Sequence, residues 1–158
     1  MGKSNKELAA LTVNQHSMVR VGLEILQAAI AANNFEKGWR TKETDHLGIE
    51  QKQTFNKRPV GELIALLHSE VTECFESYRN NEPTLHYKYP GYAPARFELA
   101  SERNGVLGKP EGMASELADV IIRVFDMADE LEIPVIQAVL EKHAYNQTRA
   151  YKHGGKAC

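Results

Sequence analysis

Two pairs of carboxylates carry the most distinctive chemistry in this sequence. Glu70 and Glu73 form an E-x-x-E pair, and Glu116 and Asp119 form an E-x-x-D pair. Side chains three positions apart are neighbours on a helix, so each pair can share one cation. Oxygen ligands suit hard cations such as Mg²⁺ or Mn²⁺. The pairs therefore predict a divalent-metal site, with an ordinary solvated helix face as the alternative.

The positions of the pairs favour the metal site. In Gly61–Asn80 the apolar residues recur with helical periodicity; Glu70 falls inside that apolar arc, and Glu73 falls at its edge. In Glu111–Leu131 the second pair begins at the border of the apolar arc. An inward carboxylate is costly unless a partner compensates its charge. Helical bundles build di-metal sites from inward carboxylates on facing helices.

Cationic and amide side chains follow an apolar line on the last expected helix, Pro134–Ala150. Lys142, Asn146 and Arg149 continue the line of Val139, on the side expected to face inward. Such groups bind phosphate oxygens well. The alternative is a solvated C-terminal turn that interacts with the helix dipole. Metal-bridged polyphosphate is the ligand class that uses the acidic and the basic groups together.

Aromatic residues offer surfaces on which a nucleobase could stack. They are Trp39, Tyr87, Tyr89 and Tyr92, although a lone aromatic more often packs in a core. The sequence has no Walker loop, no G-x-G-x-x-G and no G-x-S-x-G motif, so it gives no support to those nucleotide-binding or hydrolase classes.

Four helices must position these groups, and they predict an all-α, antiparallel four-helix bundle. Thr12 is the expected cap of the first helix. We expect a short helix or arm before that cap, a loop with room for one short helix, and a long irregular insertion that forms a binding lid. The helices are Val13–Asn33, Gly61–Asn80, Glu111–Leu131 and Pro134–Ala150; the arm is Lys3–Leu11, the loop Arg40–Arg58 and the insertion 81–110.

Composition predicts one domain spanning 1–158, with its core at about 13–156. The 158 residues are 42% hydrophobic and carry a net charge of −2, which gives no whole-chain attraction to nucleic acid or to an anionic membrane. The sequence contains no apolar run of membrane-spanning or signal-peptide length, so a cytoplasmic location is expected. The wide apolar faces of the helices predict a homodimer or homotetramer.

Three segments resemble the MazG-like branch of the all-α nucleotide pyrophosphohydrolases. The resemblance covers roughly Val13 to Lys156, in the family's order, and joins the two acidic pairs to a K-x-x-x-N-x-x-R pattern. It implies a MazG-type bundle and Mg²⁺-dependent cleavage of (d)NTP to (d)NMP and pyrophosphate, by attack of metal-activated water on the α-phosphorus. The segments are SEVTECFESYR at Ser69–Arg79, KPEGMASELADVIIR at Lys109–Arg123 and EKHAYNQTRAYKHGGK at Glu141–Lys156.

The resemblance also implies roles for single residues. The metal ligands would be Glu70, Glu73, Glu116 and Asp119, and the phosphate-side residues Lys142, Asn146, Arg149 and Tyr145. We expect Glu73 to orient or deprotonate the water, Lys142 and Arg149 to offset phosphate charge, and Trp39 to contact the base.

The sequence departs from the family pattern at two places. Many members have a doubled acid, whereas Ser69 precedes Glu70 here, so the extra carboxylate is dispensable or another acid such as Glu76 assists. The 81–110 insertion exceeds the minimal family core, so base preference cannot be transferred. The alternatives are a pyrimidine-selective dUTP/dCTP diphosphatase, a non-catalytic module that binds nucleotide or metal, and a structural bundle with solvated acids.

Overall fold

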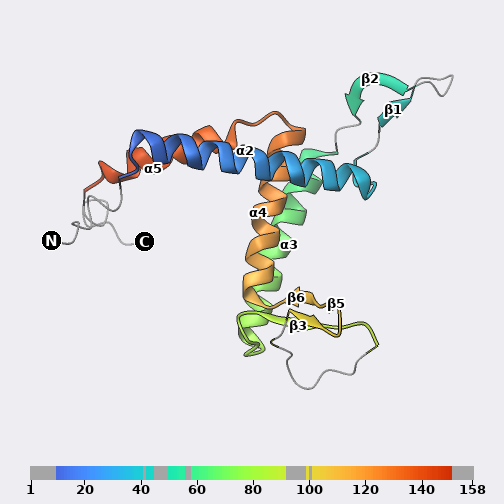
Figure 1. The fold of residues 1–158 in the computed structure, drawn as a ribbon. Helices are drawn as coiled ribbons and strands as arrows, with labels where there is room; N and C mark the ends of the chain where they lie inside the picture. Colours follow the sequence, from blue (N-terminus) through green and yellow to red (C-terminus); the bar gives the residue numbers. More distant parts are fainter. Residues whose placement is uncertain are drawn as a thin grey trace.

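The protein is mostly helical, and its helices form two antiparallel pairs. The computed structural model describes residues 10–40, 42–44, 50–55, 58–91, 99 and 101–150. In Figure 1, α3 and α4 lie side by side, α2 crosses the upper end of that pair, and α5 runs back along α2. The helices are α2 at Val13–Glu36, α3 at Val60–Arg79, α4 at Met113–Glu130 and α5 at Val135–Gln147.

The helix ends follow local chemistry. Thr12 caps α2 as expected: its hydroxyl accepts from the backbone N–H of Gln15, and the Gln15 side chain accepts from the backbone N–H of Thr12. The last helix ends earlier than the sequence predicts, because Thr148 is already its C-cap. Arg149 therefore follows α5 instead of lying within it.

The main core lies where α2, α4 and α5 meet. Its buried side chains are Ile30 of α2, Phe125 of α4, and Ile136 and Leu140 of α5. The burial of these apolar side chains stabilises the junction by roughly 25 cal/mol for each Å² of apolar surface removed from water. This core fixes the junction from which α3 and α4 extend as a separate antiparallel pair (Figure 1).

Two segments expected to be irregular contain short antiparallel strands. The Asn104–Gly105 turn, with φ of 52° and 75°, joins the β4–β5 hairpin. Asn-Gly with two positive φ values is a strong hairpin signal, which the sequence-based prediction of an irregular insertion overlooked. The pairs are β1 (Lys42–Thr44) with β2 (Glu50–Phe55), β3 (His86–Lys88) with β6 (Lys109–Glu111), and β4 (Glu102–Arg103) with β5 (Val106–Leu107).

Gly112 allows the chain to pass from β6 into α4. Its φ is +94°, and a Cβ there would lie 2.5 Å from the carbonyl oxygen of Pro83. One residue into the helix, the backbone N–H of Ala114 donates to the carbonyl of Thr84 at 2.8 Å. Gly112 thus permits a close approach that fixes where the first turn of α4 begins, and Glu116 lies on that turn.

Some expectations fall outside the described residues. Most of Lys3–Leu11, Tyr92 and residues 151–158 are among them. As far as the structure describes residues 10–150, no helix combines the length and the apolarity needed to cross a bilayer.

Candidate functional site

The packing of α3 against α4 brings three of the four predicted carboxylates together. Glu70 and Glu73 of α3 and Glu116 of α4 each offer an oxygen atom, and these oxygen atoms lie within 4.8 Å of one another. Glu70 is buried, as its place in the apolar arc predicts, whereas Glu73 is exposed. Such a cluster of three carboxylates could bind a metal ion.

The charges in this cluster repel one another. Burial raises the pKa of Glu116, and the negative charges of Glu73, Asp119, Glu70 and Glu111 raise it further. A raised carboxyl pKa means that the ionised form is disfavoured in the folded protein. A cation at this position would remove that cost, so the donor set fits a hard divalent ion.

The fourth predicted ligand, Asp119, lies beside the cluster of three. Burial raises its pKa, Glu70 raises it further, and the positive charges of Arg123 and Lys109 lower it. Asp119 and Glu70 both line a polar hollow at the surface of the protein. The structure thus places Asp119 close to the cluster without making it one of the three converging groups.

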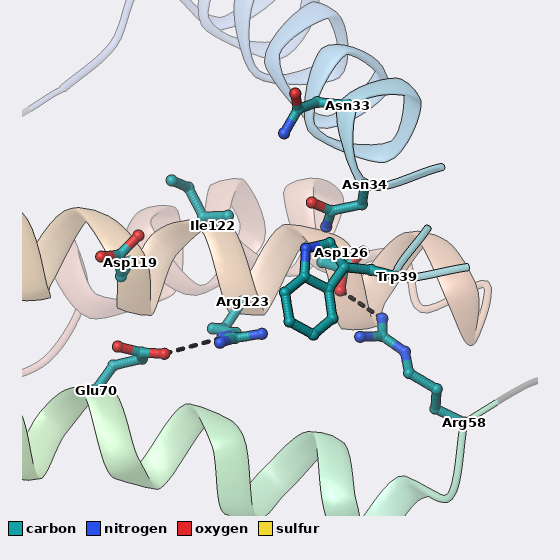
Figure 2. A pocket seen from close by; sticks show the side chains of 9 residues that line it. All are labelled: Asn33, Asn34, Trp39, Arg58, Glu70, Asp119, Ile122, Arg123 and Asp126. Atoms are coloured by element: carbon teal, nitrogen blue, oxygen red, sulfur yellow. Dashed lines mark hydrogen bonds and ion pairs between the residues drawn. The ribbon is translucent and has the colours of Figure 1, made fainter. Parts of the chain in front are cut away.

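Arg123 is a site residue that the sequence-based reasoning missed. Its Nε donates to Oε1 of Glu70 at 3.0 Å, as Figure 2 shows. Arg123 follows Asp119 by four positions, so both project from the same face of α4. That spacing was a readable signal for a cation next to the acids.

A polar hollow extends from these acids toward the end of α2. Figure 2 shows the indole of Trp39 and the guanidinium groups of Arg58 and Arg123 around it. Trp39 is 62% exposed, which leaves ring surface available to a ligand. The lining residues are Asn33, Asn34, Trp39, Arg58, Glu70, Asp119, Ile122, Arg123 and Asp126.

The predicted phosphate-side residues lie on a different surface. Lys142 and Asn146 line a second hollow along α5, and among the described residues the two hollows share no lining residue. Nζ of Lys142 lies 5.8 Å from the ring centroid of Tyr145. Both of these side chains are exposed, as is Arg149.

The expectation that this line faces inward is wrong for the single chain. The buried residues of α5 are Ile136 and Leu140, whereas Val139 is 51% exposed. Val135 also packs against the core, but the line that continues from it through Val139 to Lys142 faces the surface. A single chain does not bring the cationic residues of α5 into the hollow beside Glu70.

Comparisons with protein-family models, curated proteins and solved structures found no match for the chain.

Proposed function

We propose that the protein is a divalent-metal-dependent nucleoside triphosphate pyrophosphohydrolase, which cleaves (d)NTP to (d)NMP and pyrophosphate. The observation that carries this proposal is the convergence of Glu70, Glu73 and Glu116 from two packed helices. An adjoining hollow with an aromatic ring and two guanidinium groups supports a ligand that is both flat and anionic.

The acidic residues would hold Mg²⁺ or Mn²⁺. A bound ion of this kind supplies a Lewis acid for phosphate oxygens and lowers the pKa of a water. Glu70 and Glu116 would contribute ligand oxygens from the two helices, and Asp119, which lines the hollow together with Glu70, could join them. Glu73, which is exposed, is our candidate to orient the attacking water or take its proton.

The reaction breaks the bond between the α-phosphorus and the bridging oxygen. The water oxygen forms a bond to the α-phosphorus, and pyrophosphate leaves with the bridging oxygen. Arg123 is the described cation that contacts the acidic cluster directly, so it is placed to offset negative charge on the phosphates.

Trp39 is the candidate residue for stacking on the base. Replacing it with Leu should raise KM for the preferred nucleotide about 10-fold, because stacking of a base on an aromatic side chain is worth roughly 1–3 kcal/mol. Trp39→Phe keeps an aromatic face and should stay within about 3-fold of wild type. Equal KM values for the Leu and Phe variants would argue against stacking.

A second copy of the chain is proposed to supply Lys142, Asn146, Arg149 and Tyr145. Large apolar side chains are exposed on every helix, including Ile25 of α2, Phe75 of α3, Ile121 of α4 and Val139 of α5. Such surfaces are typical of subunit contacts. A homodimer or homotetramer would cover them and could place α5 of one copy opposite the acids of another, which would also complete the bundle.

The direct test incubates the protein with each common NTP and dNTP and Mg²⁺, and resolves the products. Nucleoside monophosphate plus pyrophosphate is expected. Nucleoside diphosphate plus phosphate would exclude attack at the α-phosphorus, and saturable binding without turnover would indicate a non-catalytic nucleotide-binding module. The same screen shows whether the enzyme prefers dUTP or dCTP.

A further inference from the structure

Asp126 of α4 joins segments that are far apart in the sequence. Its side chain is 2% exposed, and it accepts hydrogen bonds from Asn34, Arg40 and Arg58. Burying charged groups is costly even when they are paired, and apolar residues often stabilise a core equally well. A buried ionic cluster beside the candidate site therefore needs a reason other than stability.

Arg40 makes a forked contact with Asp126. Its Nη2 donates to Oδ1 of Asp126 at 2.7 Å and to the backbone carbonyl at 2.8 Å, and its Nε donates to Oδ1 at 3.1 Å. Nη1 of Arg40 also donates to Asp129 at 2.6 Å. Contacts in several directions fix the orientation of the guanidinium plane as well as its position.

Arg58 binds the same turn of α4. It donates to Oδ2 of Asp126, and its Nε and Nη2 donate to Oε2 of Glu130 at 2.9 and 2.5 Å. Its backbone N–H donates to Oε1 of Glu130 at 2.5 Å. Figure 2 shows the Arg58–Asp126 contact. Arg40 and Arg58 flank the segment that carries β1 and β2, so both ends of that segment are tied to α4.

Trp39 lies between two of these anchors. On its N-terminal side, its backbone N–H donates to the carbonyl of Asn34 at 3.0 Å, after a turn through Gly38 at φ +78°. On its C-terminal side, the next residue is Arg40. Asp126 thus contacts the residue to which the backbone of Trp39 bonds and the residue that follows Trp39.

We propose that Asp126 is a positioning residue: through Asn34, Arg40 and Arg58 it holds Trp39 and the Arg58 wall of the hollow where a nucleobase can stack. The effect on nucleotide binding rests on the proposed function. The immobilisation of the Trp39 ring by Asp126 does not depend on the proposed function. Asp126 is not one of the three converging carboxylates, so it should affect nucleotide binding more than the chemical step.

The kinetic test compares Asp126→Asn with Asp129→Asn. Asp129 also accepts from Arg40 but is 39% exposed, so it is the matched control. Asp126→Asn should raise KM about 10-fold, the value of one lost stacking contact, with kcat within about 2-fold. Asp129→Asn removes only an exposed contact of Arg40, so it should change KM and kcat much less than Asp126→Asn does. A loss of kcat of about 10-fold in Asp126→Asn, with KM unchanged, would overturn the positioning role.

A double-mutant cycle tests whether Asp126 acts through Trp39. In a Trp39→Leu background the ring is already absent, so adding Asp126→Asn should raise KM less than about 2-fold further. Additive effects, each near 10-fold, would show that Asp126 acts by another route.

A spectroscopic test separates this inference from the proposed function. Trp39 is the sole tryptophan of the chain, so intrinsic fluorescence reports on it alone. Asp126→Asn should lower the fluorescence anisotropy of Trp39 and increase its quenching by acrylamide, and Asp129→Asn should change both quantities much less. Unchanged fluorescence in Asp126→Asn overturns the inference even if the enzyme is active. Absence of any nucleotide cleavage by wild type would sink the proposed function alone.

A second variant guards against failure of Asp126→Asn to fold. Arg40→Lys keeps the positive charge but loses the forked geometry. It should change the anisotropy and KM in the same direction, by a smaller factor. Wild-type values for both quantities would contradict the proposal.

Discussion

The pKa of Glu116 is raised by burial and by the negative charges of the acidic cluster. Burial and four neighbouring carboxylates raise its pKa, so at neutral pH its ionised form costs folding free energy. Without metal, Glu116→Gln should therefore melt at a higher temperature than wild type. With Mg²⁺ at about 100 times its Kd, wild type should gain roughly 5–10 °C, and the variant should gain much less. Differential scanning fluorimetry with EDTA or Mg²⁺ measures both.

The matched control is Glu24→Gln on the exposed surface of α2. It removes the same charge from an exposed residue outside the cluster and should keep the full Mg²⁺ response. If Glu116→Gln keeps that response too, Glu116 is not a ligand.

The pKa of Asp126 is shifted in the opposite direction to that of Glu116. Burial alone would raise its pKa, but hydrogen bonds from Arg58, Asn34 and Arg40 outweigh it, so the pKa lies below its usual range. A lowered carboxyl pKa stabilises the fold above its unfolded value, near 4, and that contribution is lost as pH falls through the folded value. Asp126→Asn should lower the free energy of unfolding by about 3 kcal/mol at pH 7, because it removes the buried negative charge that the part-buried Arg40 and Arg58 share.

Urea unfolding of wild type and Asp126→Asn at pH 7 and pH 3 checks this prediction. The difference between the two proteins should shrink at the lower pH. A difference that is the same at both pH values would mean that the charge of Asp126 does not support the fold.

At the scale of elements, alanine substitution of two glycines should change the stability of the protein in opposite directions. One glycine lies just after α2 and the other lies within it. Gly38 lies just after the helix at φ +78°, a conformation that costs an L-residue roughly 1–2 kcal/mol. Gly22 lies within α2, where alanine is favoured by about 1 kcal/mol. Gly38→Ala should lower, and Gly22→Ala should raise, the free energy of unfolding, as measured by urea titration.

Neither added methyl group meets another atom within 4 Å, so the pair isolates backbone effects. Destabilisation by both substitutions would point to a contact of α2 with another subunit at Gly22.

The sequence predicted the helices and the spacing within each acidic pair because both are local patterns; three of the four acids converge in the structure, and Asp119 lies beside them. The burial of Glu70 followed from its place in the apolar arc of α3 and is confirmed. On α4 the sequence held more than the E-x-x-D pair. The pair begins a line of charged residues that recurs at spacings of three and four along one face of the helix: Glu116, Asp119, Arg123, Asp126 and Glu130.

The rest of the site could not be read from local patterns. Asp126 meets Arg40 and Arg58 across separations of 86 and 68 residues, and only the packing of α2 and α3 on α4 brings them together. Likewise, Val135 and Ile136 of the predicted α5 stripe pack in the core, whereas Val139 is exposed, because apolar side chains continue on more than one face of that helix. Whether Lys142 serves the acidic site remains a prediction.

At the scale of the whole molecule, a mixing experiment tests the proposed composite site. Glu70→Gln removes the acid and Lys142→Ala removes the cation, so each variant alone should be nearly inactive. In a mixed dimer, one site combines Glu70 of one copy with Lys142 of the other. After subunit exchange at equal amounts, about a quarter of wild-type activity should return.

Light scattering on the same samples establishes the assembly. A monomer, or a dimer whose mixture stays inactive, would contradict the sharing of residues between copies. A cis arrangement would also leave the mixture inactive, and would then require α5 to move within one chain.

The paired anchors of the β1–β2 segment have a consequence for how the protein tolerates change. Because Arg40 and Arg58 both rest on one turn of α4, the span between them is a closed loop with fixed ends. Lengthening such a loop costs little, since closure entropy grows only with the logarithm of its length. Peptide tags or altered sequences inserted between the two arginines should therefore leave the tryptophan in place, which makes this span a natural point for engineering new specificity.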